Sequence, residues 1–406
     1  MAVLRNCWSF AQNTSATLGP LLEPLEAAIR HKLITALLRH RRVLTDDERA
    51  IWALPGRLGG MGMDNPVFDS PHKFASSVSR TAPLVELIKS QERNLDKRVQ
   101  MQMKEAKKEA RKIKSARQEN EAKILQARLP EPLQRAVTLA QEKGASAIVT
   151  TLPLDREGFY MHKSDWCDTI DLRYGYYPPN MPDRCPCGKP FSLDHSQNCN
   201  FGAFRDMRHN EVRDELAKPL RKIYKDVEVE PELQNVPEDV QQHIKQRYRS
   251  AILDDNARSD IRVKGVWAKE RDAFFDIRVF NPNASSYRSL SVNAAYRKHE
   301  LEKKRQYNAR ILEVEHGSFT PLVFASTGGT SKETTVFLKK LASEVARKEN
   351  EEYAQVMGLL RVRVAFKLMR AALTMLRGSR HRRYFESDNH RTVPTDVVIA
   401  EAHINC

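Results

Sequence analysis

Two short runs decide the fold: Arg258-Ser259-Asp260-Ile261-Arg262-Val263 and Ala273-Phe274-Phe275-Asp276-Ile277-Arg278-Val279-Phe280. Both are rich in β-branched and aromatic residues, so we expect two strands joined through a loop around Lys264 and Gly265. Side chains alternate between the two faces of a strand, so Asp276 and Arg278 share the face opposite Phe275. Asp260 and Asp276 are separated by 15 residues, a spacing that can bring two carboxylates together on neighbouring strands.

A pair of carboxylates in this setting indicates a site for Mg2+ or Mn2+. Hard cations prefer oxygen ligands, and such an ion can polarise a phosphodiester and activate water. In this interpretation Asp260 and Asp276 hold the metal and Arg278 contacts the phosphate. The alternative is an ordinary ion pair between Asp276 and either Arg278 or Arg262.

The surrounding sequence predicts a mixed α/β fold. Val212, Leu216, Leu220 and Ile223 recur at helical spacing ahead of the strands. We expect strands at 227–230, 260–263, 273–280 and 322–325, and helices at 294–310, 332–348 and 356–377. This order suits a small mixed sheet with flanking helices. In the last helix, an apolar stripe is expected to pack on the core, with a basic flank that could face DNA.

A compact Cys/His knuckle precedes the two strands. Its spacing is Cys-x-Cys-x7-His-x3-Cys, from Cys185 and Cys187 through His195 to Cys199. Three thiolates and one imidazole complete a closed tetrahedral zinc shell, which would be structural because no position remains open for chemistry. Free buried thiols are the alternative.

The N-terminal part is expected to be helical. Thr45 and Glu48 form a capping-box pattern, and four glycines within Gly56–Gly62 force a loop. Residues 88–128 carry 13 basic and 6 acidic side chains with almost no Gly or Pro, which predicts a long exposed helix. That helix is either a solvated linker or an arm that contacts nucleic acid.

We divide the chain into five segments on these patterns. Residues 1–85 form a helical region, 86–130 a charged helical linker, and 131–205 a mixed segment that ends in the knuckle. Residues 206–348 form the α/β core, and 349–406 an amphipathic basic helix with a tail.

The knuckle and the core together resemble the restriction-like endonucleases of non-LTR retroelements. That superfamily carries Asp, then Asp or Glu, any residue, then Lys, and here Arg278 stands at the Lys position. Arginine cannot deprotonate water at neutral pH, although it can stabilise charge on a phosphate. The resemblance implies that Lys303 or Lys304, on the following helix, assists the attacking water.

A second resemblance covers residues 20–85. The run Leu-Pro-x-Arg-x-Gly-Gly-x-Gly-x-x-Asn-Pro at 54–66 is similar to the region after the palm in retroelement reverse transcriptases. It implies a thumb-like helical remnant. The pairs Asp46-Asp47 and Asp254-Asp255 lack the neighbours of a polymerase signature, so we expect no reverse transcriptase site.

The net charge of +15 favours a polyanionic partner. We expect double-stranded DNA first and retroelement RNA second. No run is apolar enough to span a bilayer, and residues 1–8 lack a secretory pattern. Three cysteines within 15 residues indicate metal in a reducing compartment, so the expected location is nuclear or cytoplasmic.

Three functions fit these observations. A metal-dependent DNA endonuclease is the first, with Zn2+ as structural and Mg2+ or Mn2+ as catalytic cofactors. A remnant that binds nucleic acid without cutting is the second. A protein-interaction scaffold built on the long charged helix is the third.

Overall fold

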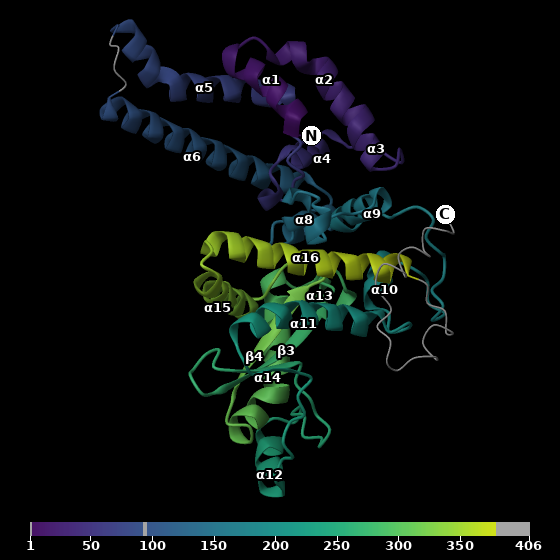
Figure 1. Ribbon diagram of the computed structural model, residues 1–406. Coiled ribbons are helices and arrows are strands. Elements are labelled where there is room, and N and C mark those ends of the chain that lie inside the picture. Colours follow the sequence, from purple (N-terminus) through teal and green to yellow (C-terminus); the bar gives the residue numbers. More distant parts are fainter. Residues whose placement is uncertain (1, 92–95, 379–406) are drawn as a thin grey trace. The chain divides into compact units, whose positions relative to one another are not determined.

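The computed structural model describes residues 2–91 and 96–378, with side chains from Trp8 onward, and the chain divides into two compact units between Gln141 and Glu142 (Figure 1). All the helices and strands assigned to the described residues of the first unit are helices. Its elements are α1 (Ala2–Thr14), η1 (Gly19–Leu22), α2 (Glu23–Ala28), η2 (Ile29–Ile34), α3 (Thr35–Leu37), α4 (Asp46–Ala53), η3 (Gly56–Leu58), α5 (Pro66–Lys89), α6 (Lys97–Arg128) and α7 (Glu131–Ala140).

The capping box at the start of α4 is confirmed. The Thr45 side chain accepts from the Glu48 N–H, and the Glu48 side chain accepts from the Thr45 N–H. The glycine loop that follows α4 folds back on it, since a Cβ at Gly60 would lie 2.0 Å from the Leu54 carbonyl oxygen. No residue with a side chain fits that position.

The charged helix begins later than the sequence predicted. α5 continues to Lys89, and α6 starts only at Lys97, where the Asp96 carboxylate accepts from the Val99 N–H as an N-cap. Residues 92–95 of the expected helix lie outside the described residues. α6 is not a free linker either, because it packs along α5 and buries Val99 and Ala110.

The second unit holds the sheet. Its elements are α8 (Ala147–Thr150), η4 (Asp155–Glu157), α9 (Lys163–Tyr174), α10 (Leu193–Asn198), α11 (Phe204–Ile223), β1 (Val227–Val229), α12 (Glu238–Arg247), β2 (Ile261–Lys264), β3 (Asp272–Phe280), α13 (Ser285–Arg288), α14 (Val292–Glu313), β4 (Ser318–Ala325), α15 (Lys332–Glu349) and α16 (Tyr353–Arg377). The strands follow the order β1-β2-β3-β4. β1, β2 and β3 pair antiparallel, and β4 runs parallel to β3 after the crossover through α14.

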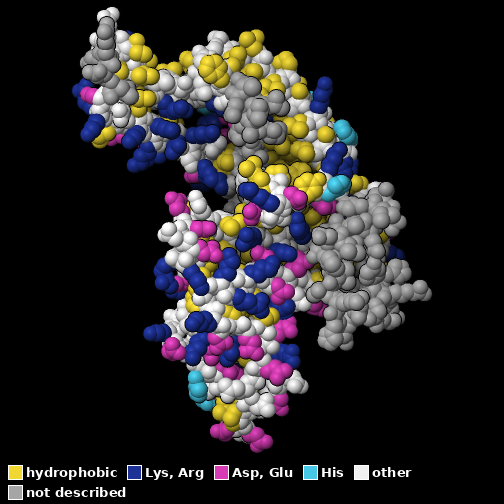
Figure 2. All heavy atoms as spheres, in the orientation of Figure 1, with side chains coloured by type: hydrophobic (Ala, Val, Ile, Leu, Met, Phe, Trp, Pro, Cys, Tyr) yellow, Lys and Arg dark blue, Asp and Glu magenta, His cyan; other side chains and the backbone are white. Residues whose placement is uncertain are grey.

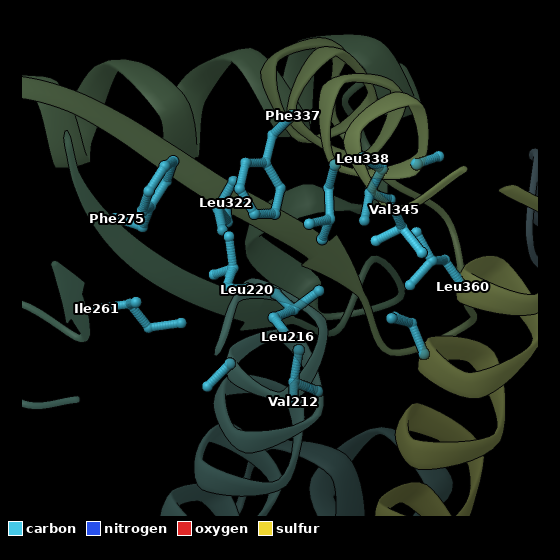
Figure 3. Packing of buried hydrophobic residues seen from close by; sticks show 14 of the residues in the cluster. Val212, Leu216, Leu220, Ile261, Phe275, Leu322, Phe337, Leu338, Val345 and Leu360 are labelled. Carbon is cyan, nitrogen blue, oxygen red and sulfur yellow. The ribbon is translucent and has the colours of Figure 1, made fainter. Parts of the chain in front are cut away.

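Alternation along β3 separates two cores. Phe275 packs with α11 and α15 in the largest cluster of buried residues, together with Leu216 and Phe337 (Figure 3). Phe274 points to the opposite face and packs against Tyr307 of α14. The sheet is therefore covered on both faces, which is why β3 is apolar on both sides except at Asp272, Asp276 and Arg278.

α16 is buried on more than one side. Val364 and Leu368 join the main core, while Phe366 and Met369 join a second cluster with Phe159 of the segment before α9. Part of its basic flank is engaged within the unit: the Arg377 guanidinium contacts both Asp168 carboxylate oxygens at 2.8 Å, and Arg370 donates to the Gly158 carbonyl. We find a central core helix where the sequence suggested a one-sided amphipathic helix.

The mixed α/β class expected from the sequence is confirmed. α12 and α13 are additions that the sequence did not predict. Across residues 2–91 and 96–378, no helix is both long and apolar enough to cross a membrane. Residues 379–406, which include the expected tail after Arg380, lie outside the described residues.

Candidate functional site

Asp260 stands immediately before β2 and is held from two directions. Its Oδ2 accepts a hydrogen bond from the Ile277 N–H of β3, and its Oδ1 lies 2.9 Å from Nε2 of His209 on α11. The Ser259 hydroxyl also donates to the Phe275 carbonyl, which anchors the start of β2. The carboxylate is thus fixed by the backbone of the neighbouring strand rather than by an Arg.

Asp276 lies in the middle of β3 and faces α14. Lys303 of that helix places Nζ 2.9 Å from Oδ2 and 3.2 Å from Oδ1 of the carboxylate. The Asp276 side chain is only 6% exposed. The ordinary ion pair with Arg278 or Arg262 is not what forms: Asp276 pairs with Lys303, and Arg262 pairs with Asp226 and Glu228.

The charge of Asp260 acts on Asp276. Burial, and then the negative charge of Asp260, raises the pKa of Asp276 to about 6, against the opposing charge of Lys303. Burial opposes the charged form of His209, yet its hydrogen bond to Asp260 and the charges of both carboxylates raise its pKa. The two carboxylates therefore lie close enough for the charge of Asp260 to act on Asp276, beside the cation Lys303 and the imidazole of His209.

The structure distinguishes the two candidate lysines. Lys303 reaches Asp276 and lies over the Tyr307 ring at 5.5 Å. Lys304, about 100° further round the helix, points away and pairs with Glu333 of α15. Of the two lysines, only Lys303 therefore contacts a carboxylate of the candidate site.

Arg278 lies two positions beyond Asp276 on the same face of β3, but it does not contact that carboxylate. It lines a cleft with Arg205 and Arg208 of α11. The potential around it is positive: burial, and then the charges of Arg278, Lys298 and Lys303, lowers the pKa of His299 to about 4.

The knuckle residues gather into one cluster that could hold a metal ion such as zinc. The ligand atoms of Cys185, Cys187, His195 and Cys199 all lie within 4.8 Å of one another. Sγ of Cys185 and Sγ of Cys199 are 3.7 Å apart, and Sγ of Cys187 is 3.3 Å from Nε2 of His195. Tetrahedral zinc with ordinary bond lengths requires about 3.8 Å between sulfurs and about 3.6 Å between sulfur and nitrogen. The donor set therefore fits such an ion.

The cluster is tied to the core through α10. The Ser192 hydroxyl caps this short helix and places His195 toward the thiols. Asn281, just after β3, donates to the Asp194 carboxylate at 2.7 Å, and Gln197 donates to the Ala372 carbonyl of α16 at 3.0 Å. Cys185 and Cys199 pack with Leu376 at the end of the same helix.

A carboxyl group away from both sites shows the effect of burial without a neighbouring carboxylate. Glu142 lies beside Tyr296 of α14. Both side chains come close to Gly329, where a Cβ would lie 2.3 Å from an oxygen of each, so a residue with a side chain would not fit there. Burial raises the pKa of Glu142 to about 7, although its hydrogen bond to Tyr296 works in the opposite direction. No second carboxylate contributes to this shift in the pKa of Glu142.

His209 was not assigned a role from the sequence. It stands in the run Arg208-His209-Asn210-Glu211, one turn before the core residue Val212, where a polar side chain carries no local signal. Only the packing of α11 beside the start of β2 brings it to Asp260.

No model of a known protein family matches this chain, and a comparison with curated proteins finds no significant match.

Proposed function

We propose that this chain is a metal-dependent DNA endonuclease of retroelement origin that nicks target DNA. The observation that carries the proposal is that Asp260 accepts from the N–H of Ile277, the residue after Asp276, that its charge acts on Asp276, and that Lys303 pairs with Asp276. Two carboxylates for metal and a cation within reach of them are what phosphodiester hydrolysis requires. The resemblance of the knuckle and core to retroelement endonucleases agrees with it.

A divalent cation fits this donor set. Asp260 and Asp276 offer hard oxygen donors, and burial together with the neighbouring carboxylate disfavours the charged form of Asp276. An added positive ion would relieve that cost. When bound, Mg2+ or Mn2+ would polarise the phosphodiester and lower the pKa of a bound water.

The protein groups have separate roles in this proposal. The Ile277 N–H and His209 orient the Asp260 carboxylate, so that it need not reorganise when substrate arrives. Lys303 balances the charge of Asp276 and stabilises negative charge that develops on the phosphate. Arg278 contacts a phosphate rather than a carboxylate.

We also propose that the Cys/His knuckle holds zinc with a structural role. Four donors leave no open coordination position, and the sulfur and nitrogen separations fit a tetrahedral ion. Nucleic acid is the proposed partner, with double-stranded DNA as substrate and retroelement RNA as a second ligand. Figure 2 shows Lys and Arg side chains gathered along α6, which supports a polyanionic partner.

One observation favours the alternative function, a remnant that binds nucleic acid without cutting it. Arg278 occupies the position of the superfamily lysine, and Lys303 is already paired with Asp276. If that pair persists in the presence of metal, the site binds DNA and does not turn over.

Conversion of supercoiled plasmid to nicked circles tests the proposal. The wild-type protein should nick with Mg2+ or Mn2+ and not without them. Asp276→Asn should lose nicking while it retains binding, and Asp255→Asn, an exposed aspartate outside the site, should behave as wild type. Binding without nicking in either metal would leave the inactive remnant as the function.

A further inference from the structure

A basic cleft lies beside the candidate site, between the knuckle and the end of β3. It encloses about 420 Å³. Arg205 and Arg208 enter it from α11, and Arg278 enters it from β3. Ser192 and Asp194 of the knuckle segment form the facing wall. We call this feature the Arg cleft.

The guanidinium groups in the Arg cleft lack counter-ions. Within residues 2–91 and 96–378, no carboxylate lies within ion-pair distance of Arg278, and Arg205 contacts the Asn200 side chain instead. Arg208 is only 4% exposed, its two contacts to carbonyl oxygens are long at 3.4 Å, and its Nε has no hydrogen-bond partner among the described residues.

The one carboxylate that lines the Arg cleft is otherwise engaged. Asp194 accepts from the side chains of Asn281 at 2.7 Å and Asn198 at 3.2 Å. Its partners are neutral amides, and among the described residues it forms no ion pair with Arg205, Arg208 or Arg278. A buried guanidinium costs free energy unless an anion pairs with it, and the planar fork of Arg matches the oxygens of a phosphate.

We propose that the Arg cleft binds a backbone phosphate of the nucleic-acid strand, next to the phosphate that lies at Asp260 and Asp276. This inference rests on the proposed function. The Cα atoms of residues two apart in a strand are separated by about 6.7 Å. The spacing of Asp276 and Arg278 along β3 is therefore comparable to the distance between successive phosphates of a nucleic-acid strand. The knuckle, as the opposite wall, would then set where the strand enters.

The assignment is tested by measuring the affinity for a labelled 30-base-pair duplex. Fluorescence anisotropy reports the binding, and no divalent metal is added. Arg278→Gln and Arg205→Gln should each weaken binding by roughly tenfold. Each should also lower the slope of log affinity against log salt by about 0.9, the value for one phosphate contact. Arg249→Gln, an exposed arginine of the same unit outside the cleft, is the matched control and should bind as wild type.

Two further variants separate charge from geometry. Arg205 is exposed, so Arg205→Gln should fold normally even if a change at the partly buried Arg278 does not. Arg278→Lys keeps the charge but loses the fork, and should bind between wild type and Arg278→Gln. Duplex affinity unchanged in both glutamine variants, or lowered equally in Arg249→Gln, would overturn the assignment.

The source of the phosphate is tested with inorganic pyrophosphate as the probe. If the Arg cleft holds a backbone phosphate, pyrophosphate at millimolar concentration should displace the duplex from wild type more than from Arg278→Gln at equal ionic strength. Pyrophosphate binding, measured by calorimetry, that Arg278→Gln abolishes while its duplex affinity stays at the wild-type value would assign the cleft to a free phosphate compound and overturn the proposal. The outcome does not depend on nicking: a protein that never nicks can retain the Arg cleft, and an active nuclease can lack it.

Discussion

The Cys/His knuckle and the Asp260/Asp276 site are built in opposite ways. All four donors of the knuckle lie between Cys185 and Cys199, within one turn and one short helix. The carboxylate site draws on α11, β2, β3 and α14, from His209 to Lys303. The knuckle is therefore encoded locally, whereas the carboxylate site exists only once the sheet and both of its covering helices are in place.

This difference separates what a metal can do for each site. Metal at the knuckle would join residues that are already close in the chain, so its binding free energy contributes to local folding. Metal at the carboxylates would bind to a site formed beforehand by the fold, so its loss should affect chemistry more than stability.

Of the four predictions that compare the two sites, the largest effect is expected at Lys303. Lys303→Ala should lower the nicking rate by about a hundredfold to a thousandfold, because it removes the cation nearest the carboxylates. Lys304→Ala is the matched control, since Lys304 pairs with Glu333, and it should change the rate little. Equal rates for the two variants would contradict the assignment of Lys303.

The second prediction addresses the knuckle. Cys187→Ser should reduce bound zinc well below one ion per chain, measured by elemental analysis, and lower the free energy of unfolding by several kcal/mol. The thermal midpoint should fall for the whole second unit, because the cluster packs on α16. Well-folded wild-type protein that contains no zinc would exclude a structural zinc site.

The third prediction uses Glu142 as a buried carboxyl without a charged neighbour. Its folded pKa of about 7 lies above the unfolded value, so its contribution to stability is complete below the unfolded pKa and is lost as pH rises through about 7. Glu142→Gln should therefore be more stable than wild type at pH 8, by at most about 3 kcal/mol. Denaturant unfolding at pH 5 and pH 8 measures the difference, which should shrink at the lower pH.

The smallest effect is expected at His209. His209→Ala should lower the nicking rate by roughly tenfold, because the Asp260 carboxylate would lose one of its two fixed partners. Duplex affinity should stay unchanged. His243→Ala, an exposed histidine on α12, is the control. A loss of binding rather than of rate would show that His209 serves the fold and not the site.

The sequence predicted those features that depend on neighbours in the chain. Alternation in β3 placed Phe275 and Asp276 on opposite faces, and the spacing of the knuckle residues brought four donors together. It could not choose between Lys303 and Lys304, because the choice depends on how α14 is rotated against β3. The break before Lys97 was missed because Asp96 acts as an N-cap within a run that otherwise favours helix.

α16 has a consequence for synthesis of the protein. This helix, Tyr353–Arg377, fills the main core, covers the cluster around Phe159 and contacts the knuckle through Ala372 and Leu376. Residues 142–349 therefore emerge from the ribosome before the element that closes their core. During that interval the apolar surfaces of α11 and α15 remain uncovered, so this unit has greater need of protection by chaperones than an equally stable fold whose central helix is made first.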